Sequence, residues 1–267
     1  MAILETKNLT RSFGKMTAVD SLSISVEAGE VFGLLGPNGA GKTTAIKMLT
    51  TLLPPTSGTA MVAGFDLSRR PCDVRRMIGY VPQLLSADGC LTGYENLLVF
   101  AKLYDLPRKE IKARVREALD FMGLSDAADR LVRTYSGGMI RKMEIAQAML
   151  HRPRVLFLDE PTVGLDPLAR RAVWKHIEEL MANYGTTILL TTHYLEEADA
   201  LCSRVALMHL GRMAALGTPM DLKASIGGNG ATLDEVFAHY TDEDGEENSK
   251  RSFHDTSRTR RTARRLG

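Results

Sequence analysis

Residues 36–43 read GPNGAGKT and directly follow the apolar run VFGLL at residues 31–35. The octapeptide matches G-x-x-x-x-G-K-[ST], the pattern of a phosphate-binding loop between a buried strand and a helix. Glycines let the backbone wrap around phosphate oxygens, and N–H groups of the loop and helix start supply positive partial charge. Lys42 would add a full charge at the β- and γ-phosphates, and the Thr43 hydroxyl would reach Mg²⁺. The motif therefore predicts a nucleotide-binding strand–loop–helix unit.

Apolar runs of strand length alternate with stretches of helical periodicity. The runs at 155–158 and 187–190 are continuously apolar, as in strands buried on both faces, whereas 22–26 alternates apolar and polar residues. This order predicts an α/β fold, a phosphate-loop NTPase core with a mainly parallel sheet and an additional N-terminal antiparallel β subdomain. Few strand signals interrupt residues 93–150, so we expect a helical subdomain there. Helices are expected at 93–104, between Pro107 and Gly123, at 137–150 and at 168–183.

Composition limits the classes of protein to which the chain can belong. Hydrophobic residues make up 44% and the formal net charge is +2, which allows a core and excludes a strongly basic nucleic-acid binder. We expect one domain over residues 1–240 and a charged, disordered tail over 241–267. The tail could contact anionic lipid or nucleic acid, but a solvated tail without a specific partner is the favoured interpretation.

The sequence also carries no sign of membrane insertion or of a disulfide framework. No apolar run approaches the roughly 18 to 20 residues of a membrane span, and the first residues do not form a secretory signal. Cys72, Cys90 and Cys202 are scattered, without a pair or a CxxC motif. We therefore expect reduced thiols.

Two carboxylates end the apolar run VLFLDE at residues 155–160. A strand buried on both faces can carry charge only at its end, where the ligand crevice of a parallel sheet opens. Asp159 is then a candidate partner of Mg²⁺, and Glu160 a candidate to polarise an attacking water. The alternative is that the pair caps a following helix, which a phosphate loop on another strand makes the weaker interpretation.

Further motifs make the chain resemble the ATP-binding cassette (ABC) ATPases. TYSGGMI at 134–140 resembles their signature, and GLDP at 164–167 resembles their D-loop. Gln83 in GYVPQ and His193 after TILLTT look like their Q-loop glutamine and switch histidine. The motifs occur in the family's order between residues 13 and 193. YSGGM and the later TLDEVFAHYT resemble most the bacterial drug-exporter group that includes the daunorubicin-resistance ATPases.

The resemblance implies a role for each matching residue. It implies the ABC ATPase fold, ATP with Mg²⁺ as cofactors, and catalysis by Glu160, His193 and Lys42. Phe13 would stack on adenine, and Asp166 would help to join two sites. The phosphates would be bound by Gly36, Pro37, Asn38, Gly39, Ala40, Gly41, Lys42, Thr43 and Thr44. Mg²⁺ would be held by Thr43, Gln83 and Asp159, and the γ-phosphate of a second copy by Ser136, Gly137 and Gly138.

Simpler interpretations of some of these residues stay open at this stage. Phe13 could pack as an ordinary aromatic side chain, Ser136 could simply cap a helix, and Asp166 could be a turn residue before Pro167. Two departures from the family pattern are also visible. Tyr135 and Met139 stand where the commonest signature has Leu and Gln, and SIGGNGA at 225–231 replaces a longer connection.

The function that we expect is that of an ATP hydrolase powering an ABC exporter of a drug or another small hydrophobic or lipid-like cargo. Its partners would be a separate transmembrane permease, docked near Gln83 and Tyr94–Tyr104, and a second ATPase subunit, with two identical chains forming the dimer. It would lie at the cytoplasmic face of the membrane, and no specific nucleic acid is expected. The alternative is a soluble ABC ATPase acting on nucleic acid or ribosomes. A nonhydrolytic regulator is disfavoured because Glu160 and His193 are present.

Overall fold

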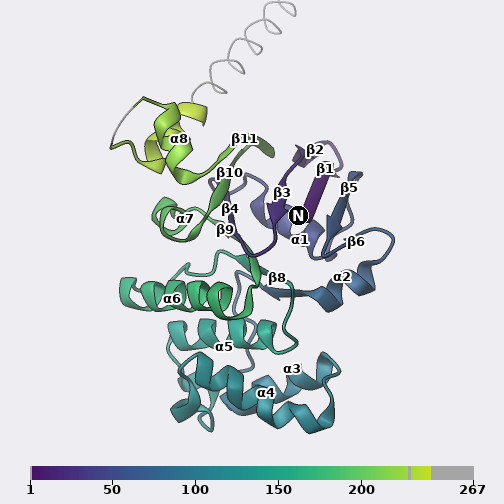
Figure 1. The fold of residues 1–267 in the computed structure, drawn as a ribbon, viewed down its shortest axis with the longest axis vertical. Coiled ribbons are helices and arrows are strands. Elements are labelled where there is room, and N and C mark those ends of the chain that lie inside the picture. Colours follow the sequence, from purple (N-terminus) through teal and green to yellow (C-terminus); the bar gives the residue numbers. More distant parts are fainter. Residues whose placement is uncertain (1, 228–229, 242–267) are drawn as a thin grey trace, which may run out of the picture.

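The computed structural model describes residues 2–227 and 230–241, which form two sheets and a layered group of helices (Figure 1). Within the described residues, one sheet has six strands in the order β11-β10-β4-β9-β8-β7. Its pairs are parallel apart from the antiparallel pair of β10 with β11. The strands are β4 (Val31–Leu35), β7 (Ile78–Val81), β8 (Val155–Asp159), β9 (Thr187–Thr192), β10 (Arg204–His209) and β11 (Arg212–Gly217). The expected mainly parallel sheet is confirmed.

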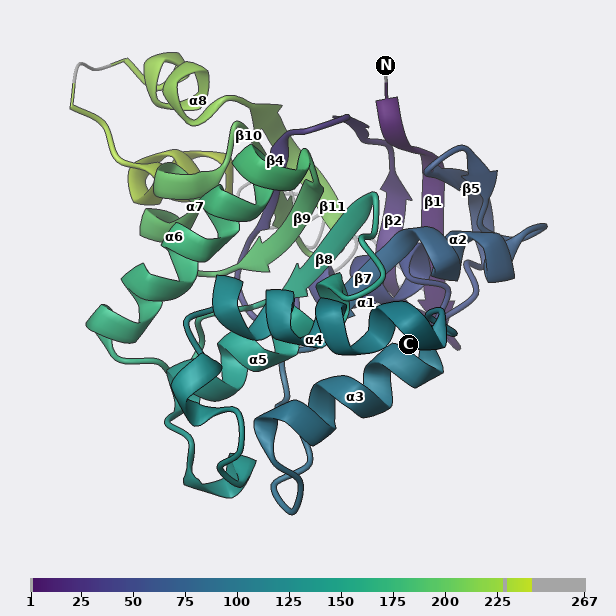
Figure 2. The ribbon, with the colours of Figure 1, turned by 60° about the horizontal axis from the view of Figure 1, so that its bottom comes forward.

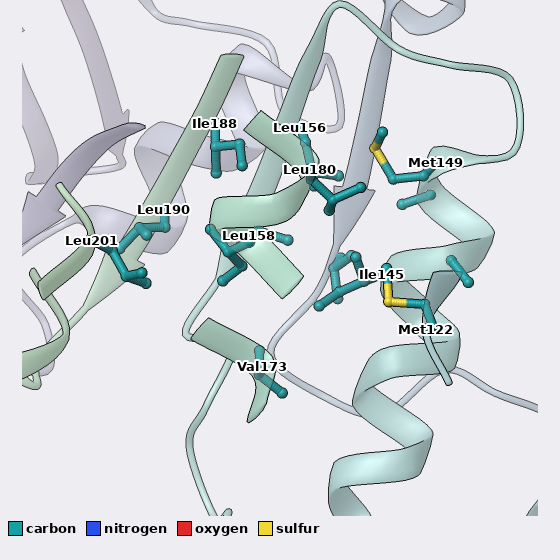
Figure 3. Packing of buried hydrophobic residues seen from close by; sticks show 14 of the residues in the cluster. Met122, Ile145, Met149, Leu156, Leu158, Val173, Leu180, Ile188, Leu190 and Leu201 are labelled. Carbon is teal, nitrogen blue, oxygen red and sulfur yellow. The ribbon is translucent and has the colours of Figure 1, made fainter. Parts of the chain in front are cut away.

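The central strands of this sheet are buried on both faces. Along β8, Val155 and Phe157 belong to the core shared with the N-terminal sheet, whereas Leu156 and Leu158 belong to the core under the helices. Alternate residues of a strand point to opposite faces, so both sets must be apolar. Figure 3 shows the helical side of this core, where Leu158 and Leu190 lie among side chains of the covering helices.

The second sheet is the expected N-terminal antiparallel one. Its order is β2-β1-β5-β6, and β3 also pairs with β1. The strands are β1 (Ala2–Phe13), β2 (Met16–Leu22), β3 (Ser25–Glu27), β5 (Ser57–Val62) and β6 (Phe65–Asp66).

One strand prediction was wrong in part, because the expected strand over 22–26 is interrupted between β2 and β3. The Thr6 hydroxyl donates to the carbonyl of Leu22 and accepts from the N–H of Ile24, both at 2.9 Å. The Thr6 side chain thus bonds to the backbone on both sides of residue 23, where the strand is interrupted.

The described helices include the four expected between residues 93 and 183, and each of these four matches its expected bounds to within one or two residues. They are α1 (Lys42–Leu49), α2 (Pro71–Met77), α3 (Gly93–Leu103), α4 (Arg108–Phe121), α5 (Gly137–Met149), α6 (Pro167–Tyr184), α7 (Leu195–Leu201), α8 (Pro219–Ser225) and a last helix over 233–241. Two single 3₁₀ turns, Ser125–Ala127 and Val132–Thr134, lie between α4 and α5.

Helix α5 is the centre of the helical layer. It contacts α3 and α4 on one side and α6 and the strand β7 on the other. Figure 2 shows α3, α4 and α5 grouped together, away from α8. The start and the buried face of α5 are therefore linked to the edge of the parallel sheet. Of the expected disordered tail over 241–267, residue 241 ends the last helix, and residues 242–267 lie outside the described residues.

The first prediction concerns the double-sided core. Leu158 is fully buried on β8, so Leu158→Ala should lower the free energy of unfolding by about 2–5 kcal/mol through lost burial and a residual cavity. Urea denaturation at neutral pH measures this. Leu168→Ala on α6, whose side chain is 80% exposed, is the control and should change the free energy by less than about 0.5 kcal/mol. A loss of that small size in Leu158→Ala would contradict the described packing.

Candidate functional site

A pocket of about 410 Å³ opens at the carboxyl end of β4, where the loop over residues 36–41 leads into α1. The walls of the pocket come from the N-terminal sheet, the loop and the ends of two neighbouring strand segments. Its lining residues are Phe13, Met16, Ala18, Asn38, Gly39, Ala40, Gly41, Lys42, Thr43, Thr44, Gln83 and Glu160. Most of the residues predicted from the phosphate-loop motif therefore line one pocket.

Two glycines of this loop are required by their surroundings. Gly36 has φ 152° and Gly41 has φ 100°, and a Cβ on either would collide with a backbone carbonyl, that of Met208 or Ala18 respectively. Only glycine combines these backbone angles with such a close approach. The loop is therefore held tightly between β10 and β2.

Lys42 places a positive charge at the floor of the pocket. Its side chain is 4% exposed, and its Nζ donates to the carbonyls of Gly36 at 2.8 Å and Pro37 at 3.1 Å. The same Nζ lies 3.3 Å from Oε1 of Glu160, which is equally buried. An ammonium buried in this way is a strong electrostatic partner for an entering phosphate group.

Asp159 connects the loop to the next strand in the sheet. Its Oδ1 accepts a hydrogen bond from Thr43 Oγ1 at 3.1 Å and one from Thr191 Oγ1 at 2.6 Å. Hydroxyl, carboxylate and amide oxygens are the donors that Mg²⁺ prefers, so Thr43, Asp159 and Gln83 fit that ion. Among the described residues, no group of three or more His, Cys, Asp or Glu side chains could hold a metal without other ligands. A divalent cation here would thus take further oxygens from phosphates and water, as Mg²⁺ commonly does.

Glu160 is the point on which four chain segments converge. Its Oε2 accepts from Gln83 Nε2 at 3.1 Å and lies 3.2 Å from Nδ1 of His193. Its backbone has φ 48°, and its N–H donates to both the carbonyl and the hydroxyl of Thr191 at 3.0 Å. A non-glycine residue held at positive φ stores strain that the surrounding bonds must maintain, as is frequent in functional sites. The structure thus brings Glu160, His193, Lys42 and Gln83 together.

Phe13 stands at the mouth of the pocket. Its side chain is 43% exposed, so core packing does not account for it. The guanidinium carbon of Arg11 lies 4.6 Å from the ring centroid and covers one face. The ring can therefore offer its other face to a flat aromatic ligand.

The remaining predicted residues lie outside this pocket. Ser136 caps α5 by accepting from the N–H of Met139 at 3.3 Å, and Asp166 caps α6 by accepting from that of Ala169 at 2.9 Å. Ser136 and Gly137 are exposed, whereas a Cβ on Gly138 would lie 2.9 Å from Cβ of Ala169, so Gly138 lets α5 and α6 pack closely. Within the described chain, these residues are not part of the pocket's lining.

Sequence reasoning missed two buried polar residues, of which one binds residues of the site and the other binds Thr162, two residues after Glu160. Thr191 binds both Asp159 and the backbone of Glu160, and its only signal was a threonine at the end of a buried strand. Glu197 is completely buried, and its Oε1 accepts from Thr162 Oγ1 at 2.8 Å and from Trp174 Nε1 at 2.9 Å. Burial raises the pKa of Glu197, opposed by the hydrogen bonds that it accepts.

Comparison with known proteins agrees with this geometry. The sequence pattern described as "ABC transporter" matches residues 19–163. The daunorubicin/doxorubicin resistance ATP-binding protein DrrA of Streptomyces peucetius is 48% identical over 85% of this chain and 68% of that protein. The linearmycin resistance ATP-binding protein LnrL of Bacillus subtilis is 40% identical over 85% of this chain and 73% of its own length.

A solved structure, that of the ATP-binding subunit of an ABC transporter, superposes with a TM-score of 0.79 at 33% identity. It covers 90% of this chain and 99% of the solved one. Across residues 2–227 and 230–241, we find no helix that is both long enough and apolar enough to cross a bilayer.

The second prediction follows from Glu197. Its folded-state pKa lies above the unfolded value, so the unfolded chain gives up this proton first as the pH rises above about 4.5. The free energy of unfolding of the unmodified chain therefore falls as the pH rises toward the folded-state pKa of Glu197. Glu197→Gln has no proton to lose at this position, so its free energy of unfolding should not show this fall. The free energy of unfolding of the variant, relative to the unmodified chain, should be higher at pH 8 than at pH 5 in urea titrations.

The matched control is Glu196→Gln, because the Glu196 side chain is exposed and solvated in folded and unfolded chains alike. Its difference from the unmodified chain should be the same at both pH values. If the difference between Glu197→Gln and the unmodified chain is also the same at pH 5 and pH 8, the argument that burial raises the pKa of Glu197 is wrong.

Proposed function

Starting from the fact that the chain belongs to the ABC transporter family, whose ATP-binding domains hydrolyse ATP, we propose that its hydrolysis powers an exporter. The relatives described above are named for resistance to daunorubicin, doxorubicin and linearmycin. By that likeness the cargo is a drug or another small hydrophobic or lipid-like molecule. The observation that carries the proposal is the convergence of Lys42, Gln83 and His193 on one buried carboxylate beside a phosphate loop.

In this proposal ATP lies along the pocket from Phe13 to Glu160. Adenine stacks on the face of Phe13 that Arg11 leaves uncovered. The N–H groups of residues 36–44 and the Lys42 ammonium surround the β- and γ-phosphates. Thr43 and Gln83 would hold Mg²⁺, which would supply positive charge against the phosphate oxygens, and Asp159 orients Thr43 through their hydrogen bond.

Hydrolysis then depends on the release of Glu160 from Lys42. Phosphate oxygens bring more negative charge to Lys42 than one carboxylate does, so the ammonium turns to the nucleotide. The freed carboxylate of Glu160 accepts a proton from a water that attacks the γ-phosphorus in line, and ADP leaves. His193, 3.2 Å from that carboxylate, helps to orient the water and the γ-phosphate.

The active unit in this proposal is a pair of identical chains. Ser136 and Gly137 are exposed at the start of α5, outside the pocket of their own chain. In a two-fold dimer the same surface meets itself, so each chain presents these donors to the other chain's γ-phosphate. Asp166, at the start of α6, lies at the same contact.

Subunits of this family act with transmembrane permeases. We place the contact with the permease at the loop after Gln83 and at α3. Apolar side chains are unusually exposed there: Leu84 at 81%, Leu85 at 54%, Val99 at 42% and Leu103 at 73%. Such a cluster is typical of an interaction surface. Contact with a permease would hold the chain at the cytoplasmic face of the membrane.

The third prediction tests the role of Glu160. Glu160→Gln keeps the shape and the hydrogen bond to Gln83 but cannot accept the proton of the water. Its turnover number should fall by about 10²–10⁴, whereas its dissociation constant for Mg-ATP should change by less than about threefold. Phosphate release and equilibrium binding of ATP measure the two quantities.

Glu178→Gln, an exposed position on α6, is the control and should leave both unchanged. Normal turnover in Glu160→Gln would remove Glu160 from the mechanism.

A further inference from the structure

Helix α5 buries an ion pair that the proposed chemistry does not use. The side chains of Arg141 and Glu144 are 2% and 1% exposed, and Arg141 Nη1 lies 3.1 Å from Glu144 Oε2. The two residues are one helical turn apart on the face of α5 that looks toward the parallel sheet and the loop after β7.

Both side chains bind the backbone of that loop. Arg141 donates from Nη1 to the carbonyl of Pro82 at 2.7 Å and from Nη2 to the carbonyl of Gln83 at 2.9 Å. Glu144 Oε1 accepts from the backbone N–H and from the hydroxyl of Ser86. The pair thus binds three residues of the loop, each of which lies 58 or 59 residues away along the chain from the side chain that binds it.

Stability alone is a poor reason for such a pair. Taking two charges out of water is costly. Apolar side chains of similar volume in the same place often make the protein equally stable. Burial lowers the pKa of Arg141, which Glu144 partly offsets. The pair supplies directional hydrogen bonds, which apolar side chains cannot form. A planar guanidinium holds the two carbonyls that it binds in one plane.

The loop that is held in this way carries Gln83. Its carbonyl is bound by Arg141, and its side-chain amide donates to Glu160 Oε2 at 3.1 Å. The same helix begins at Ser136 and Gly137, little more than one turn before Arg141. One rigid element therefore connects the exposed start of α5 with the residue that touches Glu160.

We propose that Arg141 and Glu144 are positioning residues that hold Gln83 against Glu160 and tie this contact to the start of α5. The proposal rests on the proposed function of the site. Arg141 is not among the residues that line the pocket, and it binds the carbonyl of Gln83, so its effect on hydrolysis must pass through Gln83. Displacement of the start of α5 would carry the Gln83 loop with it.

The test is a double-mutant cycle on the full chain, with phosphate release at saturating Mg-ATP as the readout. Arg141→Lys keeps the charge opposite Glu144 but cannot span both carbonyls. It should lower the turnover number about tenfold through misplacement of Gln83. The dissociation constant for ATP should stay within about threefold and the melting temperature near that of the unmodified chain. In a Gln83→Ala background, Arg141→Lys should have no further effect.

The control is Arg114→Lys on α4, which alters another helical ion pair, with Glu110 at 3.6 Å, away from the loop. It should leave turnover unchanged. The proposal is overturned if Arg141→Lys is fully active, if Gln83→Ala is fully active, or if Arg141→Lys lowers turnover by the same factor in both backgrounds.

A second variant covers the case in which Arg141→Lys does not fold. Arg141→Met combined with Glu144→Leu replaces the pair with apolar side chains of similar size, which the interior accepts. It should fold, bind ATP and show the same loss of turnover, and full activity would overturn the proposal. An unmodified chain without ATPase activity would instead defeat the proposed function, so the two failures are distinguishable.

Discussion

The burial of β4, β8 and β9 on both faces is the constraint on which the site depends. Strands packed between two hydrophobic cores cannot carry charge along their length, so their charged groups emerge only at the carboxyl ends. Because the three strands are neighbours and parallel, those ends lie side by side. The phosphate loop, Asp159 with Glu160, and Thr191 to His193 thereby meet in one place.

In this site a buried ammonium and a buried carboxylate neutralise each other. Lys42 and Glu160 are both almost fully buried, and either charge alone would be costly there. Their pairing compensates both charges and so stabilises the pocket. When a nucleotide binds, Lys42 can turn to its phosphates and Glu160 to a water. Neighbouring hydrogen bonds, from Thr191 to Asp159 and from Gln83 to Glu160, fix the carboxylates in direction. The carboxylates are therefore oriented before any ligand arrives, which favours electrostatic catalysis.

The sequence predicted the features that are encoded locally. The phosphate loop, the buried strands and the helix limits follow from short-range patterns, and the fold class is confirmed. The interruption at residues 23 and 24 was not predictable, because it depends on the side chain of Thr6, far away along the chain. Arg141 and Glu144 were missed for the same reason. On a helix they look like a solvated i, i+3 pair, and only the packing of α5 against the loop over 82–86 buries them. Ser136 and Asp166 are helix caps within one chain, so a role beyond capping requires a second copy.

The central claim is that two copies of this chain share each ATP site. It is tested most directly by mixing two inactive variants. Lys42→Ala lacks the charge at the phosphate loop, and Ser136→Glu places a like charge against the partner's γ-phosphate. In a mixed dimer both changes fall in one site and the other site is intact, so hydrolysis should return to about a quarter of the unmodified rate. If the mixture stays as inactive as each variant alone, although mixed dimers form, the account of a shared site is wrong.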